Sequence, residues 1–201
     1  MSVRANRLKL LAILALFVIP LLLALMMFKG QMPLLSGETI NQGKLIQPPV
    51  PLDWTAAIPA NETHGTADLE GSWVILMPVP KACSQDCLKK VTGLRQVHRA
   101  SGREQHRIRL ALLSESEWDK ASQEQFDGIY NQFMLLSDPS QELFDALQVA
   151  ASHNQIHPEA LATYLVDPLG NLMMAYDMAD SETRMSKDLK RLLTWSKQDK
   201  G

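Results

Sequence analysis

Cys83 and Cys87 are the only thiols in this chain of 201 residues. A close cysteine pair can form a disulfide, exchange disulfides with another protein, or bind a soft metal ion. The apolar spacing that follows predicts a helix that starts at the pair, where residues four apart lie on one face about one turn apart. The positive end of the helix dipole would stabilise a thiolate there and lower its pKa. A single structural disulfide is the alternative interpretation.

The segment in front of the pair predicts a buried strand. Residues 73–77 are all apolar, are rich in branched and aromatic side chains, and lie between Gly71 and Pro78. Such a run is typical of a strand that is covered on both faces. The Cys-bearing helix should then continue to about Ala100, because Ser101-Gly102 follows as a stop signal.

The rest of the chain alternates between the two kinds of element. Predicted strands cover residues 107–113, 133–136, 163–167 and 172–176, and a tight turn joins the last two as a hairpin. Predicted helices cover residues 115–126, 137–152 and 183–197, the first of them with capping-box spacing at Ser114 and Glu117. This order predicts an α/β fold, a thioredoxin-like mixed sheet flanked by helices.

An apolar segment near the N-terminus predicts a transmembrane anchor. Residues 10–28 carry no charged or polar side chain and approach the length of about 20 residues that a spanning helix needs. Arg4, Arg7 and Lys9 precede the segment, whereas only Lys29 follows closely, so the N-terminus should be cytoplasmic. A cleaved signal peptide is the alternative, but no Ala-x-Ala cleavage pattern follows. We expect a single-pass protein of a bacterial inner membrane with a periplasmic C-terminal domain.

Length and composition predict one globular domain behind this anchor. The predicted parts are a cytoplasmic N-terminus at 1–9, the anchor at 10–28, an extended tether with Pro and Gly at 29–67, and a thioredoxin-like domain at 68–201. Within the tether, Leu52 and Trp54 are either anchors on the domain surface or simple linker. The net charge is −2 and basic residues are interspersed with acidic ones, which argues against a nucleic-acid partner.

A metal site is a second possible use of the pair. Two thiolates do not complete a four-ligand zinc site, but they favour copper(I), and an added imidazole would also allow copper(II). His157 is our choice for that imidazole. In a thioredoxin-like sheet, the loop of His153 and His157 lies beside the start of the active-site helix. His98 and His106 should lie at its far end.

From about residue 68 to residue 197, the chain resembles the Sco/SenC family, membrane-anchored thioredoxin-like proteins of cytochrome oxidase assembly. The resemblance rests on the N-terminal anchor, Leu69-x-Gly71-x-Trp73-Val74-x-Leu76, Cys83-x-x-x-Cys87 and Tyr164-Leu-Val-Asp-Pro-x-Gly170. Family members usually have a proline after each cysteine, whereas this chain has Ser84 and Leu88. The chain therefore resembles a divergent relative of the family.

The resemblance implies a function and a set of partners. It implies that Cys83 and Cys87, with a distal histidine that we assign to His157, bind copper for cytochrome oxidase subunit II or act on the thiols of its copper centre. The implied partners are the membrane and subunit II or another assembly factor. A thiol-disulfide oxidoreductase of the cell envelope and a non-catalytic scaffold with a structural disulfide are the alternatives. Such oxidoreductases normally carry Cys-x-x-Cys and a cis-proline where this chain has Ala162-Thr163.

Overall fold

The computed structural model describes residues 3–28, 40–60, 65–80, 83–127, 132–154, 156, 162–177 and 182–196. The chain divides into two compact units, residues 1–40 and 41–201. The first unit contains helix α1 (Val3–Phe28), and Pro20 lies inside it. No helix in the described part of the chain is both long and apolar enough to cross a membrane.

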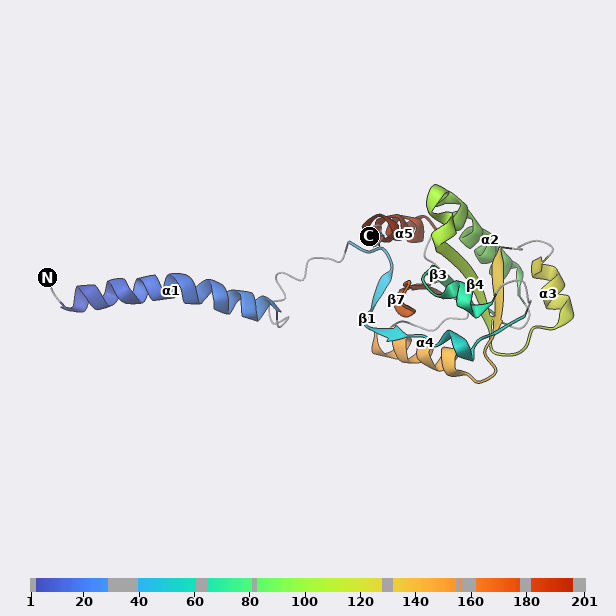
Figure 1. Ribbon diagram of the computed structural model, residues 1–201, viewed down its shortest axis with the longest axis horizontal. Coiled ribbons are helices and arrows are strands. Elements are labelled where there is room, and N and C mark those ends of the chain that lie inside the picture. The colour runs from blue at the N-terminus through green and yellow to red at the C-terminus, as the bar shows by residue number, and fades with distance from the viewer. Residues whose placement is uncertain are drawn as a thin grey trace. The chain divides into compact units, whose positions relative to one another are not determined.

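The second unit is built on a mixed sheet of seven described strands (Figure 1). They are β1 (Lys44–Pro51), β2 (Ile58–Pro59), β3 (Trp73–Pro78), β4 (Ile108–Ser114), β5 (Phe133–Ser137), β6 (Thr163–Val166) and β7 (Asn171–Tyr176), arranged as β1-β7-β6-β3-β4-β5-β2. Strands β3, β4 and β5 are parallel, and the other neighbouring pairs are antiparallel. Trp73 of β3 lies opposite Ile108 of β4.

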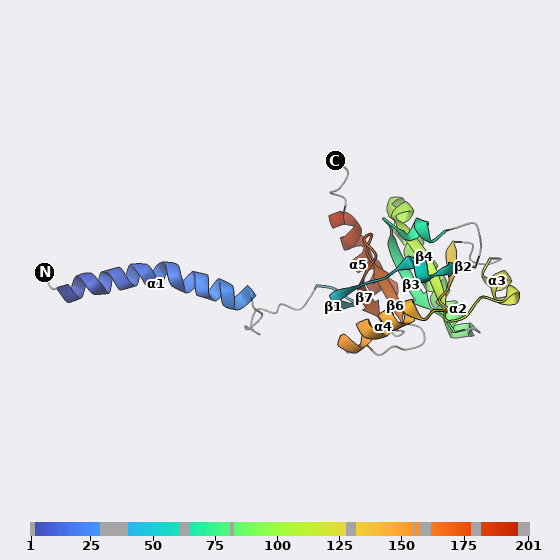
Figure 2. The same cartoon turned by 60° about the horizontal axis from the view of Figure 1, so that its bottom comes forward.

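Helices cover both faces of this sheet (Figures 1 and 2). They are α2 (Gln85–Ala100), α3 (Lys120–Asp127), α4 (Glu142–His153) and α5 (Glu182–Trp195), with 3-10 turns η2 (Trp54–Ala56), η3 (Thr66–Leu69) and η4 (Gly102–Arg107). Helices α2 and α5 pack together on one face, and α4 lies on the other. The predicted mixed sheet with flanking helices is confirmed.

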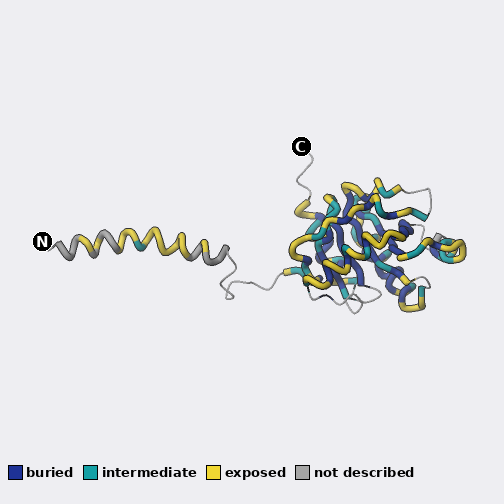
Figure 3. Tube along the Cα trace, turned by 90° about the horizontal axis from the view of Figure 1, so that it is seen from below, coloured by how far each residue is buried: buried dark blue, intermediate teal, exposed yellow. Residues whose placement is uncertain are grey.

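Strand β3 is buried on both faces, as its all-apolar sequence predicts. Ile75 points into the apolar cluster under α2 and α5, whereas Val74 and Leu76 point into the cluster under α4. All three side chains are fully buried. Figure 3 shows buried segments, in dark blue, in the middle of the unit and exposed segments, in yellow, around them. The strand that leads to the cysteines is therefore held in the core on both of its faces.

Residues 44–59 differ from the predicted tether. They form β1 and β2, the two edge strands of the sheet. An edge strand tolerates proline because one side of its backbone needs no ladder hydrogen bond, which explains Pro48, Pro49 and Pro51 in β1. Leu52 and Trp54 are only 7% and 6% exposed, so they are anchors in the core under α4 rather than simple linker. The folded unit therefore begins at about residue 41, well before residue 68.

Helix α3 begins later than the capping-box spacing predicts. Ser114 is the last residue of β4, and the helix starts only at Lys120. The intervening Trp118 is 9% exposed and its Nε1 donates a hydrogen bond to the carbonyl oxygen of Leu136 at 2.9 Å. Asp119 accepts a hydrogen bond from the amide of Ser122, so it caps the helix instead. Burial of the tryptophan overrides the local helix signal.

Asp188 of α5 holds the point at which the chain enters the second unit. Its carboxylate is 2% exposed and accepts hydrogen bonds from the amides of Gln42 and Gly43, at 2.8 and 2.9 Å. The hydroxyl of Tyr176 donates a third hydrogen bond at 3.0 Å. A carboxylate that is buried in this way is stable only because it receives several hydrogen bonds. The start of the folded unit is thereby fixed to α5.

Candidate thiol site

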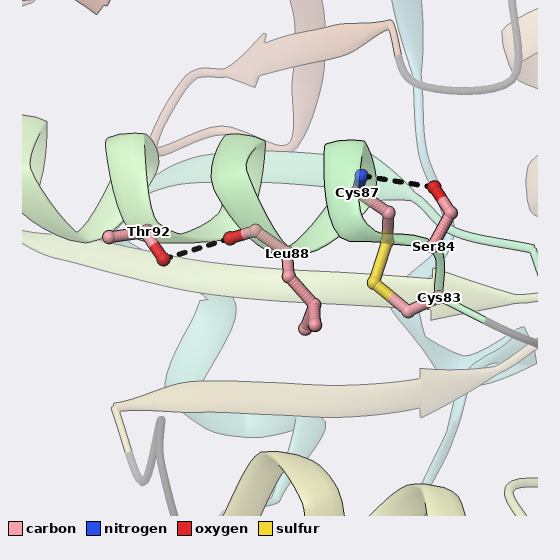
Figure 4. Close-up of a disulfide and its surroundings, with 5 residues drawn as sticks. All are labelled: Cys83, Ser84, Cys87, Leu88 and Thr92. Atoms are coloured by element: carbon pink, nitrogen blue, oxygen red, sulfur yellow. Dashed lines mark hydrogen bonds between the residues drawn. A yellow bond between two sulfur atoms is a disulfide. The ribbon is translucent and has the colours of Figure 1, made fainter.

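Cys83 and Cys87 form a disulfide, with their Cα atoms 5.4 Å apart (Figure 4). The pair directly follows β3, at the edge where the parallel strands β3, β4 and β5 all end. In α/β sheets, ligands and substrates characteristically bind outside the carboxyl ends of the strands. The position of the disulfide is therefore that of a site rather than that of a remote crosslink.

A serine cap sets the local geometry of the pair. Ser84 has an extended backbone and its hydroxyl accepts a hydrogen bond from the amide of Cys87 at 3.3 Å, so Ser84 is the N-cap of α2 (Figure 4). Cys83 therefore lies outside the helix, and Cys87 lies in its first turn. The predicted placement of both cysteines on one helical face is wrong in this respect, because the disulfide closes across the cap. The sequence signal for the cap was available in Ser84, which follows the first cysteine.

The two sulfur-bearing residues differ in exposure. Cys87 is fully buried in the apolar cluster under α2 and α5. Cys83 packs against the edge of that cluster and remains partly exposed. An attacking partner can therefore reach Cys83 but not Cys87.

A groove of about 680 Å³ runs along α2 from the turn that carries Cys87, although neither cysteine lines it. Eight residues of α2 between Gln85 and Gln96 form one wall, and Glu182 of α5 contributes to the other. Lys90 is 7% exposed, and its ammonium lies 4.0 Å from the Glu182 carboxylate. Lys89 and Asp86 form an exposed ion pair of 2.9 Å nearby. The surface beside the disulfide therefore carries both signs of charge.

The predicted third metal ligand cannot be placed. His157 lies outside the described residues. Within the part of the chain that is described, no three His, Cys, Asp or Glu side chains gather into a metal site. His98 is separated from Cys87 by most of α2, about 16 Å at 1.5 Å per residue. His106 lies beyond it in η4, as the sequence predicted.

His98 has an altered acidity that arises from packing. Its Nε2 lies 3.3 Å from the carbonyl oxygen of Gln105. Burial lowers the pKa of His98 below its ordinary value, and the hydrogen bonds to backbone carbonyls oppose this effect only in part. This histidine belongs to the far end of α2 and takes no part in the thiol site.

Thr163 is a buried polar residue near the thiol pair that the sequence did not single out. It is fully buried at the start of β6, and its hydroxyl has no hydrogen-bond partner among the described residues. Alternation along β6 puts its side chain on the same face as Leu165, which shares an apolar cluster with Cys87. The only sequence signal was its position, since Ala162-Thr163 precedes the strand beside β3.

A comparison with known families now assigns the chain. The family described as transmembrane-like, thioredoxin-like, C-terminal domain matches residues 73–196, from the first residue of β3 to the end of α5. The chain belongs to this family. No curated protein matches the chain. The Cys83–Cys87 disulfide lies inside the matched region.

Solved structures show that the fold of this family member is similar to that of Sco proteins. Yeast Sco1 with copper bound has a TM-score of 0.54 at 13% identity, covering 79% of this chain and 95% of its own. Apo Sco1 from Thermus thermophilus has a TM-score of 0.52 at 15% identity, and the match covers 77% of this chain and 99% of Sco1. Arabidopsis thaliana ScoI with copper bound has a TM-score of 0.52 at 12% identity, and the match covers 75% of this chain and 99% of ScoI. The predicted divergent likeness to Sco/SenC proteins is confirmed at the level of the fold.

Proposed function

We propose that this protein is a membrane-anchored assembly factor of a haem-copper oxidase, and that Cys83 and Cys87 handle copper or the thiols of the oxidase copper centre. The observation that carries the proposal is the disulfide at the start of α2, directly after the carboxyl end of β3. A thiol pair at that position has one partly exposed and one buried member, which suits reversible chemistry with a partner protein.

The pair also has the chemistry to hold copper(I) as cargo. Reduction would give two thiols at the start of α2, and both would lose their protons on binding copper(I), where the helix dipole favours the negative charge. Soft thiolate ligands select copper(I) over harder divalent ions. His157 is the imidazole that we propose as a third ligand. Yeast Sco1 and Arabidopsis ScoI, which have a similar fold, are solved with copper bound, and this supports the copper hypothesis.

Thiol exchange is the second form of the same proposal. The Cys83 thiolate attacks one sulfur of a client disulfide, and the other client sulfur leaves as a thiolate. Cys87 then attacks the sulfur of Cys83, which releases the second client sulfur and closes the disulfide seen here. Two electrons pass from the pair to the client, and an envelope dithiol donor would reduce the pair again. Cys83 is the attacking residue because it is the accessible one.

The length of the disulfide loop argues against the structural-disulfide alternative. The cysteines are four apart in sequence, so the bond closes a very short loop. A loop of this size contributes only about 2 kcal/mol in the chain-entropy treatment. The fold meanwhile has an apolar cluster on each face of its sheet. Stabilisation alone is therefore a weak reason for the pair.

The membrane anchor and the periplasmic location are proposed from the sequence. Residues 10–28 have no charged side chain and lie within α1, and basic residues precede them. An exported domain would meet an oxidising compartment, in which a cysteine pair can persist as a disulfide.

The test is a copper(I) titration of the reduced full-length chain in detergent micelles, against a chromogenic copper(I) chelator. We expect one copper(I) per chain, lost in Cys83→Ser and in Cys87→Ser. His157→Ala should weaken binding about tenfold or more, whereas His153→Ala is the matched control and should not, because His153 is exposed at the end of α4.

Thiol exchange is measured on the same preparations, with an oxidised peptide that carries two client-like cysteines. Reduced wild type should reduce the peptide, and Cys87→Ser should stop at a mixed disulfide on Cys83. A chain that neither binds copper(I) nor reduces the peptide would be a scaffold, and the proposal would be refuted.

A further inference from the structure

The outward side of α5 is strongly basic. Its exposed residues include four cations and one tryptophan, at helical spacing: Arg184, Lys187, Lys190, Arg191 and Trp195. Between residues 183 and 196 the only acidic residue is Asp188, which is 2% exposed at the edge of this face and accepts hydrogen bonds from Gln42, Gly43 and Tyr176. The whole chain has a net charge of −2, so this positive surface is a local feature.

The lysines of this surface are available to a partner. Within the described part of the chain, the ammonium groups of Lys187 and Lys190 form no ion pair, unlike Lys44 and Lys89, which pair with Asp177 and Asp86. Cations that project from an amphipathic helix into water attract anionic surfaces over a distance of about 10 Å at 0.1 M salt.

Trp195 adds an apolar contact at the end of the same surface. It is 81% exposed, whereas Trp54, Trp73 and Trp118 are 6%, 4% and 9% exposed. An indole that is left in water is unusual, and tryptophan characteristically lies at the interface between lipid headgroups and hydrocarbon. A basic helix face with an exposed tryptophan is typical of segments that lie on a membrane surface.

The chain enters the second unit at the helix that carries this surface. Asp188 fixes Gln42 and Gly43 to α5, and Figure 2 shows β1 starting beside that helix. Residues 29–41 connect α1 to Gln42 and can span at most about 50 Å, at 3.6 Å per residue. The helix that receives the tether is therefore the one that carries the basic face.

We propose that the outward face of α5 docks on anionic phospholipid headgroups of the membrane that holds the anchor. The basic side chains contact the headgroup phosphates, and Trp195 inserts at the interface. This inference rests on the anchor of the proposed function. Docking would fix the orientation of the disulfide relative to the membrane, which a tether alone would leave free.

The test uses the full-length chain in vesicles that contain brominated lipids, which quench tryptophan fluorescence only over a short distance. One preparation is neutral phosphatidylcholine, and the other is an equal mixture of phosphatidylcholine and phosphatidylglycerol. Because the other three tryptophans are buried, quenching that disappears in Trp195→Phe reports the position of Trp195. The charge variant is Lys187→Gln/Lys190→Gln, and its matched control is Arg99→Gln/Lys120→Gln, which removes two exposed cations elsewhere.

We expect quenching of Trp195 in the anionic vesicles and little in the neutral ones. Each lysine near an anionic surface strengthens association about fivefold, so the charge variant should lower the ratio of docked to undocked protein about 25-fold. The control variant should leave this ratio unchanged, and 1 M salt should abolish docking.

Equal quenching in both kinds of vesicle, or quenching that Lys187→Gln/Lys190→Gln leaves intact, would overturn the proposal. Absence of quenching in both would also overturn it and would direct attention to an acidic protein partner. Flotation separates this result from failure of the anchor. If the chain has no anchor, it will not float with neutral vesicles in 1 M salt. If the face of α5 still docks, the same chain will float with anionic vesicles at low salt.

Discussion

Reduction of the Cys83–Cys87 disulfide should lower the unfolding free energy of the domain by only about 2 kcal/mol. The bond closes a loop with a sequence separation of four. In the chain-entropy treatment a loop of this size restricts the unfolded chain by roughly 6–7 cal/mol/K, which is about 2 kcal/mol at 25 °C. Cys87 stays buried as a thiol in the same apolar cluster, so reduction removes little packing.

The assay is equilibrium unfolding of the full-length chain in micelles by urea, with and without a phosphine reductant. Fluorescence of the buried Trp73 and Trp118 reports the loss of the core. For a slope of about 1–3 kcal/mol per molar urea, the midpoint should fall by about 1 M with an unchanged slope. Cys83→Ser keeps the buried thiol and should behave like the reduced wild type, with no response to the reductant.

A loss of about 4 kcal/mol or more on reduction would refute this reasoning. The same would hold if the reduced chain lost its cooperative transition. Either result would mean that the disulfide holds the fold together, and it would favour the scaffold alternative over a working thiol site.

Three further predictions concern packing and pH, and urea midpoints measure each of them. Asp188→Asn should lower the free energy of unfolding by about 2–4 kcal/mol, because Gly43 and Tyr176 lose a charged acceptor. The control Asp177→Asn changes a partly exposed ion pair and should lower it by less than about 1 kcal/mol. Gly43→Ala should lower the free energy of unfolding by about 2–3 kcal/mol, because the new methyl group would lie 2.6 Å from the ring of Tyr176. Burial lowers the pKa of His98, so its neutral form favours the folded state, and stability should decline as the pH falls below about 6.5. His98→Gln should flatten this decline between pH 7 and pH 5.

The central strands and the order of elements were predictable from the sequence. A run such as Trp73 to Met77 can be buried only in the middle of a sheet, and helical apolar spacing identifies α2 and α5. The edge strands were not predictable, because the prolines of β1 are typical of a linker until a neighbouring strand covers them. The start of α3 was missed because Trp118 binds the carbonyl oxygen of Leu136, a contact that no local pattern encodes.

The candidate site was predictable in its residues and less so in its geometry. The isolation of Cys83 and Cys87 in the sequence was enough to identify the pair. Their unequal exposure was not predictable, because it depends on how α2 rests on the sheet. The burial of Thr163 was not predictable either, because it depends on the place of β6 between β7 and β3 in the sheet.

The attachment of Gln42 and Gly43 to Asp188 determines where mechanical tension would enter the domain. In the anchored protein that we propose, a client held at Cys83 that moved away from the membrane would put tension on the segment between α1 and β1, and this tension would reach these two amides first. Without Asp188, the same tension would act on β1, an edge strand paired only with β7, and could peel it away one hydrogen bond at a time. The carboxylate transfers the load to α5, so the sheet that supports the disulfide is protected from forces on the tether.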